Sequence, residues 1–198
     1  MLWRRDMRKR DETTPEVYVF FGLIAGGKST LAQAWASRLH IPYYNSDIVR
    51  KELAGGADLR AGKQKYGRGI YSEDLTRKTY QALLGKAADE LARGRSVALD
   101  ASYRCRADRD GVRALKKKHG TRIRFILCSC PEAEARARME KRAHDPLAVS
   151  DGRWDIYLRQ KEIFEPPDEL QPAEFVTLST IAPVDVLVDR LARALENK

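Results

Sequence analysis

Residues 17–39 read VYVFFGLIAGGKSTLAQAWASRL, and this stretch decides the fold of the 198-residue chain. Its first five residues are β-branched or aromatic, which is typical of a buried strand, and the run ends at Gly22. A helical pattern begins at Lys28, where apolar side chains recur so that they share one face. These side chains belong to Leu31, Ala34, Trp35 and Leu39. The stretch therefore predicts a strand, a glycine-rich turn and a helix in direct succession.

The turn, Gly22–Ser29, reads GLIAGGKS and fits the pattern G-x-x-x-x-G-K-[ST] of a phosphate-binding loop. Its glycines allow a tight bend whose N–H groups point inward, and the following helix adds its positive amino end. Lys28 can reach the β- and γ-phosphates of a nucleotide, and the Ser29 hydroxyl can ligate Mg²⁺. A turn that binds nothing is the weaker alternative, because the match falls where a strand becomes a helix. We expect ATP and Mg²⁺ to bind here, with ATP contacted by Gly22, Ala25, Gly26, Gly27, Lys28, Ser29 and Thr30.

The composition describes one water-soluble globular domain, with 43% hydrophobic and 33% charged residues. No run of 18 apolar residues predicts a membrane span, and the N-terminus lacks the apolar core of an export signal. Three cysteines without a disulfide framework suit a reducing compartment, so we expect a cytoplasmic protein. Cys128 and Cys130 alternate along an apolar run, where core packing is favoured over a metal site because no further ligands accompany them.

The ends and the charge of the chain leave two questions open. Residues 1–14 mix both charges with little apolar content, so we expect a flexible charged arm, or a linker remnant, ahead of a domain at 15–198. An upstream domain in the natural protein is also compatible with this arm. The net charge of +9 suits either a nucleic-acid partner or an arginine-rich enzyme that handles polyanionic ATP. The basic residues are spread over several segments, which favours the second interpretation.

Further strands and helices alternate along the chain. Strands are expected at 17–21, 41–45, 97–100, 123–129 and 175–178. Helices are expected at 28–39, 46–53, 72–93, 108–119, 154–164 and 184–195, with another starting at Pro131. The segments 55–69 and 143–152 lack an apolar period and are expected to be irregular. Strands joined through helices of this length require crossovers, which predicts an α/β fold with a five-stranded parallel sheet covered by helices on both faces.

The motifs that the chain lacks narrow its function. No Asn-Lys-x-Asp motif follows the fourth expected strand, so a GTPase switch is not supported. The chain is too short for the additional domains of a helicase or a transporter ATPase. A small transferase that moves the γ-phosphoryl group to an acceptor remains. Such an enzyme needs a base, an acidic group for Mg²⁺ or substrate, cations that neutralise developing charge, and a cover that excludes water.

Four sequence elements resemble the small P-loop kinases related to polynucleotide kinase, gluconate kinase, adenylylsulfate kinase and the zeta toxins. The elements are GLIAGGKS at 22–29, NSDIVR at 45–50, LDAS at 99–102 and RMEKR at 138–142. The resemblance extends from Val17 to about Gln160 and is greatest to predicted kinases with an AAA-type ATP-binding domain. One departure lies in the phosphate loop, where Ala25-Gly26-Gly27 stands in place of the Gly-Ser-Gly of many relatives.

The resemblance implies roles for residues outside the phosphate loop. Asp47 would take the proton of the acceptor hydroxyl, and Arg50, one helical turn later, would hold the acceptor. Asp100 would hold Mg²⁺ through water or contact the acceptor. Ser102 and Arg104 would line the acceptor pocket. The alternatives are helix capping by Asp47, a solvated surface arginine at 50, and a strand-end carboxylate at 100 that caps the next turn.

The resemblance also implies a lid that carries arginines. Arg138 and Arg142 are four residues apart and share a helix face, so one would lie against adenine and the other on phosphate. Arg153, beyond the irregular segment, is a further candidate. A solvated basic face is the alternative, since neighbouring residues are basic as well.

These features predict an ATP- and Mg²⁺-dependent kinase that phosphorylates a hydroxyl of a small molecule, with Lys28, Asp47 and Arg142 as catalytic residues. Two alternatives stay open. A 5′-hydroxyl polynucleotide kinase would account for the positive charge, and a nucleotide-binding regulatory or toxin-like ATPase would need no metabolite acceptor. Residues 55–69 match no substrate family, so they do not identify the acceptor.

Overall fold

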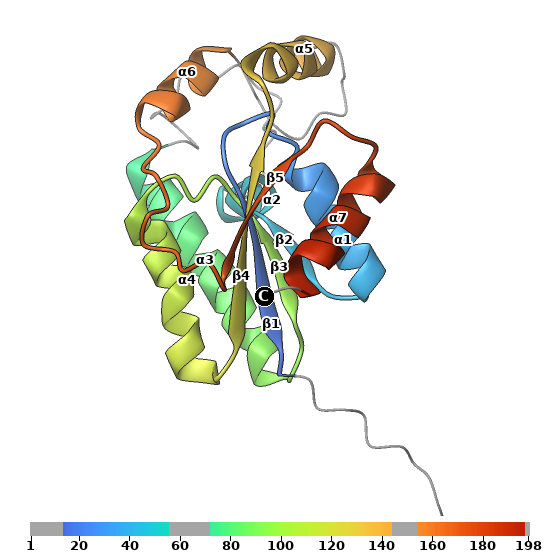
Figure 1. Cartoon of the computed structure of the whole chain (residues 1–198). Helices are drawn as coiled ribbons and strands as arrows, with labels where there is room; N and C mark the ends of the chain where they lie inside the picture. The colour runs from blue at the N-terminus through green and yellow to red at the C-terminus, as the bar shows by residue number, and fades with distance from the viewer. Residues whose placement is uncertain (1–13, 56–71, 144–153, 197–198) are drawn as a thin grey trace, which may run out of the picture.

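The computed structural model describes residues 14–55, 72–143 and 154–196, and it confirms the expected α/β architecture (Figure 1). The strands are β1 (Glu16–Phe21), β2 (Tyr43–Asn45), β3 (Val97–Asp100), β4 (Arg122–Ser129) and β5 (Phe175–Ser179). The helices are α1 (Lys28–Leu39), α2 (Ser46–Leu53), α3 (Glu73–Ala92), α4 (Arg106–His119), α5 (Glu132–Ala143), α6 (Trp154–Glu162) and α7 (Val184–Glu196).

The five strands form one parallel sheet in the order β2-β3-β1-β4-β5. β1 is central because the chain winds outward from it in both directions, which places the turn after β1 at the crevice where ligands bind in such sheets. Asp100 is in register with Phe20 of β1 and with Asn45 of β2. The carboxyl ends of the three strands therefore bring their following loops together.

Helices cover both faces of the sheet, as expected (Figure 1). Alternate residues of β1 point to opposite faces: Val17, Val19 and Phe21 pack with α3 and α4, whereas Tyr18 and Phe20 pack with α1 and α7. Helices α5 and α6 lie beyond the carboxyl end of the sheet, above the turn that follows β1. No helix within the described segments is both long and apolar enough to cross a membrane.

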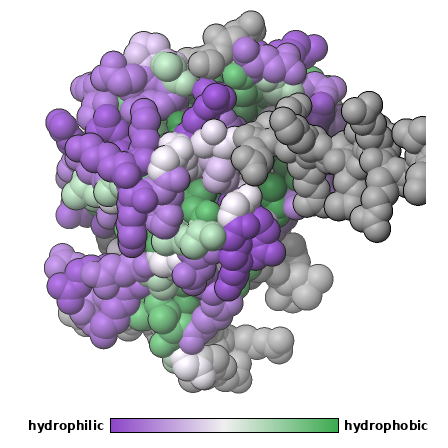
Figure 2. All heavy atoms as spheres, turned by 90° about the horizontal axis from the view of Figure 1, so that it is seen from below, coloured by the Kyte–Doolittle hydropathy of each residue, from purple (hydrophilic) through white to green (hydrophobic). Residues whose placement is uncertain are grey.

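The opposite end of the molecule, at the amino ends of the strands, is mostly hydrophilic (Figure 2). Arg93 and Arg95, between α3 and β3, pair with Glu90, and Arg122 at the start of β4 pairs with Glu16. Two carboxylates therefore offset part of the positive charge of these three arginines locally.

Three boundaries differ from the sequence-based expectation by two residues, and one of them is the end of α6 at Glu162 in place of residue 164. β2 begins at Tyr43 and not at residue 41, because Pro42 has no N–H to donate to the ladder. α4 begins at Arg106 and not at residue 108, because the carboxylate of Glu165 accepts the N–H of Arg106 at 2.6 Å. A residue 59 positions away thus caps the helix, and no local pattern indicates that. The expected arm (apart from residue 14), nearly all of the 55–69 loop and the lid segment after residue 143 lie outside the described residues.

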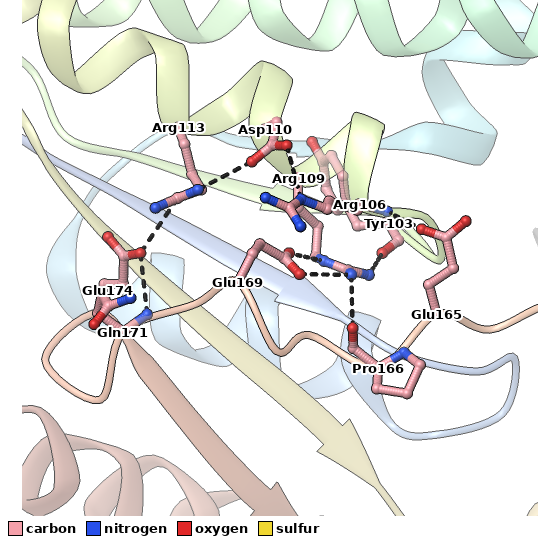
Figure 3. Close-up of polar contacts among 10 residues, drawn as sticks. All are labelled: Tyr103, Arg106, Arg109, Asp110, Arg113, Glu165, Pro166, Glu169, Gln171 and Glu174. Carbon is pink, nitrogen blue, oxygen red and sulfur yellow. Dashed lines mark hydrogen bonds and ion pairs between the residues drawn. The ribbon is translucent and has the colours of Figure 1, made fainter.

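A buried arginine joins the loop after β3 to the segment after α6 (Figure 3). Arg109 of α4 has no solvent exposure and pairs with Glu169 through two contacts, Nε–Oε1 at 2.5 Å and Nη2–Oε2 at 3.1 Å. Its remaining donors reach the carbonyl oxygens of Tyr103 at 3.0 Å and of Pro166 at 3.2 Å. This bidentate arrangement fixes two segments that both border the turn after β1.

We expect Arg109→Met to lower the free energy of unfolding by about 3–5 kcal/mol, because it leaves the Glu169 carboxylate buried without its partner. Chemical denaturation followed by circular dichroism measures this loss. Arg106→Met is the matched control, since Arg106 is mostly exposed and its ion pair with Asp110 should contribute about 0.5 kcal/mol. Equal losses in the two variants would contradict a specific role for the buried pair.

Candidate active site

The turn after β1 has the geometry that a phosphate loop requires. Gly22 and Gly27 have φ angles of 126° and 82°, which residues other than glycine rarely adopt. Gly27 also serves as the N-cap of α1 and supplies no capping side chain. The N–H groups at the start of α1, from Lys28 to Thr30, therefore lack partners inside the helix and make its positive end a suitable place for an anion.

The loop packs so closely that a side chain would clash at each of its three glycines. A Cβ on Gly22 would lie 2.6 Å from the carbonyl oxygen of Cys128, and one on Gly27 would lie 2.7 Å from Oγ1 of Thr180. The Thr180 hydroxyl contacts the loop in turn by donating to the carbonyl of Gly26 at 3.0 Å. The loop is thus shaped by the ends of β4 and β5 as well as by its own sequence.

Ala25 adopts a left-handed conformation with φ 60°. This conformation costs an L residue about 1 kcal/mol. The Ala25 side chain is 3% exposed and packs with Ala135 and Met139 of α5 and Tyr157 of α6. Burial of this methyl group contributes about 0.8 kcal/mol, which offsets most of the cost.

Lys28 lies inside the curve of the loop. Its Nζ donates to the carbonyl of Leu23 at 2.8 Å, so the side chain folds back over the bend where phosphates are expected. Its charge also acts on Asp47 and on the Cys128 thiol, whose pKa burial raises to about 12. Lys28 is therefore within electrostatic reach of the carboxylate expected to serve as the base.

Arg138 of α5 lies against the phosphate loop. Its Nη1 donates to the carbonyl of Ala25 at 3.2 Å and to Oγ1 of Thr180 at 3.1 Å, and its Nη2 donates to the carbonyl of Thr180 at 2.7 Å. Glu134 pairs with the Nε of Arg138 at 2.7 Å. This network holds the loop from the side of β5. A guanidinium donates its hydrogen bonds within its own plane, so its flat face takes no part in them. The Arg142 side chain and Arg153 lie outside the described part of the chain.

Asp47 and Arg50 form an ion pair at the start of α2, with Oδ1 and Nη1 2.8 Å apart. The helix is capped by Asn45, whose Oδ1 accepts the N–H groups of Asp47 at 2.9 Å and Ile48 at 3.2 Å. The Asp47 carboxylate is thus not needed for capping. Burial raises the pKa of Asp47, the charge of Asp100 raises it further, and Arg50 and Lys28 oppose the shift.

Asp100 is 1% exposed at the end of β3, and its Oδ2 accepts two hydrogen bonds from β2. The Tyr43 hydroxyl donates at 2.7 Å and the Asn45 amide at 2.6 Å. Asp100, which is expected at the metal, is therefore held by two side chains of β2.

Ser102 and Arg104 lie on the loop between β3 and α4. The carbonyl of Ser102 accepts the N–H of Gly22 at 3.2 Å, and its hydroxyl lies 3.0 Å from the Tyr80 hydroxyl. The carbonyl of Arg104 accepts the N–H of Glu165 at 2.9 Å. Their backbones thus tie this loop to the phosphate loop on one side and to the segment after α6 on the other.

The family model described as an AAA domain matches residues 17–167, which is most of the chain and runs from β1 through α6. This chain belongs to the AAA-domain family. A search of curated proteins finds no match.

Solved structures share the fold of this AAA domain. A sugar kinase from Janibacter sp. HTCC2649 superposes with a TM-score of 0.66 at 18% identity, covering 93% of this chain and 95% of the other. A gluconokinase from Sinorhizobium meliloti 1021 gives 0.63 at 17% identity, covering 93% of both chains. The APS kinase of Mycobacterium tuberculosis, solved with AMPPNP and APS, gives 0.65 at 17% identity, covering 92% and 98%. At these identities the likeness establishes the fold, which is that of the P-loop kinases.

An apolar cavity of about 250 Å³ borders the phosphate loop at Leu23, Ile24 and Gly26. It is enclosed by Leu23 and Ile24 of the loop, by the end of β4, and by Tyr157, Lys161 and Phe164. Such a lining does not suit a triphosphate, which needs N–H donors and cations. In this AAA domain the phosphates are therefore expected on the side of the α1 N-terminus.

The residues of the AAA domain fit Mg²⁺. This ion prefers oxygen ligands and retains several waters, so one or two protein oxygens suffice beside the phosphates of a nucleotide. The hydroxyl of Ser29 and the carboxylate of Asp100 supply such oxygens. Among the described residues, no three His, Cys, Asp or Glu side chains cluster as an all-protein metal cage would require.

The AAA domain also uses residues that the sequence analysis did not single out. Tyr43 and Asn45 hold Asp100, Thr180 supports the phosphate loop, and the Gln160 amide oxygen of α6 accepts the N–H of Ile24 at 2.9 Å. Each partner lies far away in the sequence, so a single chain gives no signal for these contacts. The N-cap pattern at 45–48 indicates the capping role of Asn45 but not its bond to Asp100.

Proposed function

We propose that this protein is an ATP-dependent kinase that transfers the γ-phosphoryl group to a hydroxyl of a small-molecule acceptor. One observation carries the proposal: the carboxyl ends of β1, β2 and β3 lie in register, so the phosphate loop, Asp47 at the start of α2 and Asp100 follow neighbouring strand ends. A triphosphate, a base and an oxygen ligand for Mg²⁺ would therefore meet at one place. The fold shared with a sugar kinase and a gluconokinase supports a hydroxyl acceptor.

The proposed mechanism assigns one task to each group. The N–H groups of the phosphate loop and Lys28 hold the β- and γ-phosphates, and Arg138 and Arg142 add positive charge from α5. Ser29 and Asp100 would hold Mg²⁺, which neutralises the charge that develops on the phosphates. Asp47 accepts the proton of the acceptor hydroxyl while the hydroxyl oxygen bonds to the γ-phosphorus. At the same time the bond between the γ-phosphorus and the bridging oxygen of the β-phosphate breaks. ADP leaves with the electron pair of the broken bond.

Arg50, Ser102 and Arg104 border the region where the acceptor would lie. Arg50 is paired with Asp47, so it orients the base in addition to any contact with the acceptor. The Ser102 carbonyl accepts the N–H of Gly22, which keeps the loop between β3 and α4 at a fixed distance from the phosphate loop. When the base and the phosphoryl donor are held in this way, their proximity and orientation favour in-line transfer.

The experiment is a transfer screen with ATP labelled at the γ-phosphate, offered sugars, nucleosides, aminoglycosides and oligonucleotides separately. We expect one small-molecule class to become labelled, and Lys28→Met to label nothing. The oligonucleotide arm tests the 5′-hydroxyl polynucleotide kinase that the net charge of +9 favours, and salt-dependent binding would accompany it. Hydrolysis of ATP without transfer to any class would contradict the proposal and favour a regulatory ATPase.

A further inference from the structure

Thr180 joins the end of β5 to the phosphate loop and to α5. Its hydroxyl oxygen lies 3.0 Å from the carbonyl oxygen of Gly26 and accepts a hydrogen bond from Nη1 of Arg138 at 3.1 Å. The side chain is 3% exposed, so little water can reach the hydroxyl to take over either bond. The proposed mechanism gives Thr180 no task, although this residue connects the phosphate loop with an arginine that adds positive charge there.

The chemistry of these groups determines the direction of each hydrogen bond. A guanidinium only donates, so the Thr180 oxygen accepts from Arg138 and keeps its own hydrogen for a carbonyl. Two carbonyl oxygens lie within reach, that of Gly26 at 3.0 Å and that of Ser129 at 3.2 Å. The Ser129 carbonyl already accepts the N–H of Thr180 at 2.8 Å. Within the described part of the chain, the Gly26 carbonyl has no other donor, so the hydroxyl hydrogen goes to Gly26.

A bond to the Gly26 carbonyl also fixes the direction of the Gly27 N–H. The two groups belong to one trans peptide unit, in which the C=O and the N–H point in opposite directions. The preceding peptide shows the same arrangement. The Ala25 carbonyl accepts from Arg138 at 3.2 Å, and the Gly26 N–H on the far side of that peptide donates to the Leu23 carbonyl at 3.1 Å. Once the Gly26 carbonyl is held as well, the Gly27 N–H points away from β5.

The Gly27 N–H is available to a ligand, because it has no acceptor among the described residues. Gly27 stands directly before α1, whose first N–H groups also lack partners inside the helix. N–H groups that run from a turn into the start of a helix form a cradle for phosphate oxygens. Rotation of the peptide between residues 26 and 27 would turn a carbonyl oxygen toward the anion in place of an N–H.

We propose that Thr180 is a positioning residue, whose hydroxyl holds the peptide between Gly26 and Gly27 so that the Gly27 N–H faces a phosphate group of the bound nucleotide. In this role Thr180 acts through the two glycines. The inference rests on the proposed function only in that a nucleotide must bind the phosphate loop. It does not depend on which acceptor receives the phosphoryl group.

Thr121 offers a matched control. It is 2% exposed, and its hydroxyl also donates to a backbone carbonyl, that of Pro15. It lies directly before β4, at the amino end of the sheet and away from the phosphate loop. Thr180→Val and Thr121→Val each replace a buried hydroxyl with a methyl group of similar size and leave one carbonyl without that donor. Only the first of these carbonyls belongs to the phosphate loop.

The test is binding of a fluorescent ADP analogue, followed by anisotropy, together with thermal denaturation of each variant. We expect Thr180→Val to bind the analogue about 10-fold more weakly, because a buried carbonyl without its donor no longer holds the peptide in its orientation. Thr180→Ser keeps the hydroxyl and should bind within about threefold of the unsubstituted protein. Thr121→Val should lose a similar amount of thermal stability and keep its nucleotide affinity.

Three outcomes would overturn the inference. Unchanged affinity in Thr180→Val would show that the hydroxyl is not needed. An equal loss in Thr121→Val would indicate a general effect on the fold, and an equal loss in Thr180→Ser would assign the effect to the methyl group. If Thr180→Val does not fold, Thr180→Cys replaces it, because a thiol is a weaker donor than the hydroxyl of Thr180→Ser. Equal affinities of these two variants would then contradict the inference.

The experiment also separates this inference from the proposed function. If the unsubstituted protein binds the analogue but transfers phosphate to no acceptor class, the proposed kinase is refuted, and the role of Thr180 is decided by the binding measurements alone. Failure of the unsubstituted protein to bind the analogue would refute both.

Discussion

Lys28→Met is expected to lower ATP turnover by at least about 10²–10³-fold, the loss that follows when one preorganised group is removed from a developing charge. The Lys28 amine folds over the phosphate loop, 2.8 Å from the Leu23 carbonyl, so methionine removes the cation while keeping most of the side-chain volume. Release of labelled phosphate measures the change. A fluorescent nucleotide should also bind more weakly, because in the proposed mechanism the lysine contacts phosphate before and during transfer.

Lys78→Met is the matched control for this variant. Lys78 is more than half exposed on α3, where it pairs with Asp74, and it should leave turnover unchanged. If Lys28→Met turns over ATP within about twofold of the unsubstituted protein, this result would contradict the role assigned to the phosphate loop in the mechanism.

Asp47→Asn is expected to lower phosphoryl transfer by about 10²–10⁴-fold, the usual contribution of a positioned base. Asparagine has the same shape and can still accept from Arg50, so ATP binding should stay within about twofold. The capping of α2 should also persist, because Asn45 supplies it. Labelled transfer and nucleotide binding, measured on the same preparation, separate the two effects.

The control for Asp47→Asn is Asp74→Asn, which changes an exposed carboxylate at the start of α3. It should affect neither transfer nor binding. Full transfer by Asp47→Asn would refute the assignment of the base and leave Asp100 as the remaining carboxylate at this edge.

The pH dependence of transfer gives a second test of Asp47. A base acts only when ionised, so the rate should fall as the pH drops through the pKa of Asp47. Because burial and the charge of Asp100 raise this pKa, the fall should begin at a higher pH than for an exposed aspartate. Asp47→Asn should lack this limb in its residual activity, whereas an unaltered limb would assign it to another group.

The strands and helices could be predicted well because their signals are local. β1 is a run of β-branched and aromatic residues, α3 begins at the cap Ser72, and the phosphate loop carries its own pattern. Two of the three boundary differences arose where Pro42 removed a donor and where the distant Glu165 capped α4. Only the second depends on a partner that a sequence window does not contain.

The candidate site could be predicted only in part. The pattern at 22–29 identifies the phosphate loop, and the resemblance at 45–50 and 99–102 implies Asp47, Arg50 and Asp100. The side chains that orient these groups were missed, because their roles arise from pairing between strands. Asn45 is in register with Asp100, and the sequence spacing of 55 residues between them carries no information about that contact.

By itself, the sequence determined the order of elements, the parallel α/β class and the phosphate loop, because hydrophobic period, caps and glycine positions act over a few residues. Only the tertiary structure decided how the polar groups are oriented: Asp100 held by Tyr43 and Asn45, Arg109 buried against Glu169, and Thr180 and Arg138 against the loop. The physical reason is that hydrogen bonds and ion pairs act over a few ångströms, and the order of strands in the sheet determines which distant residues come that close.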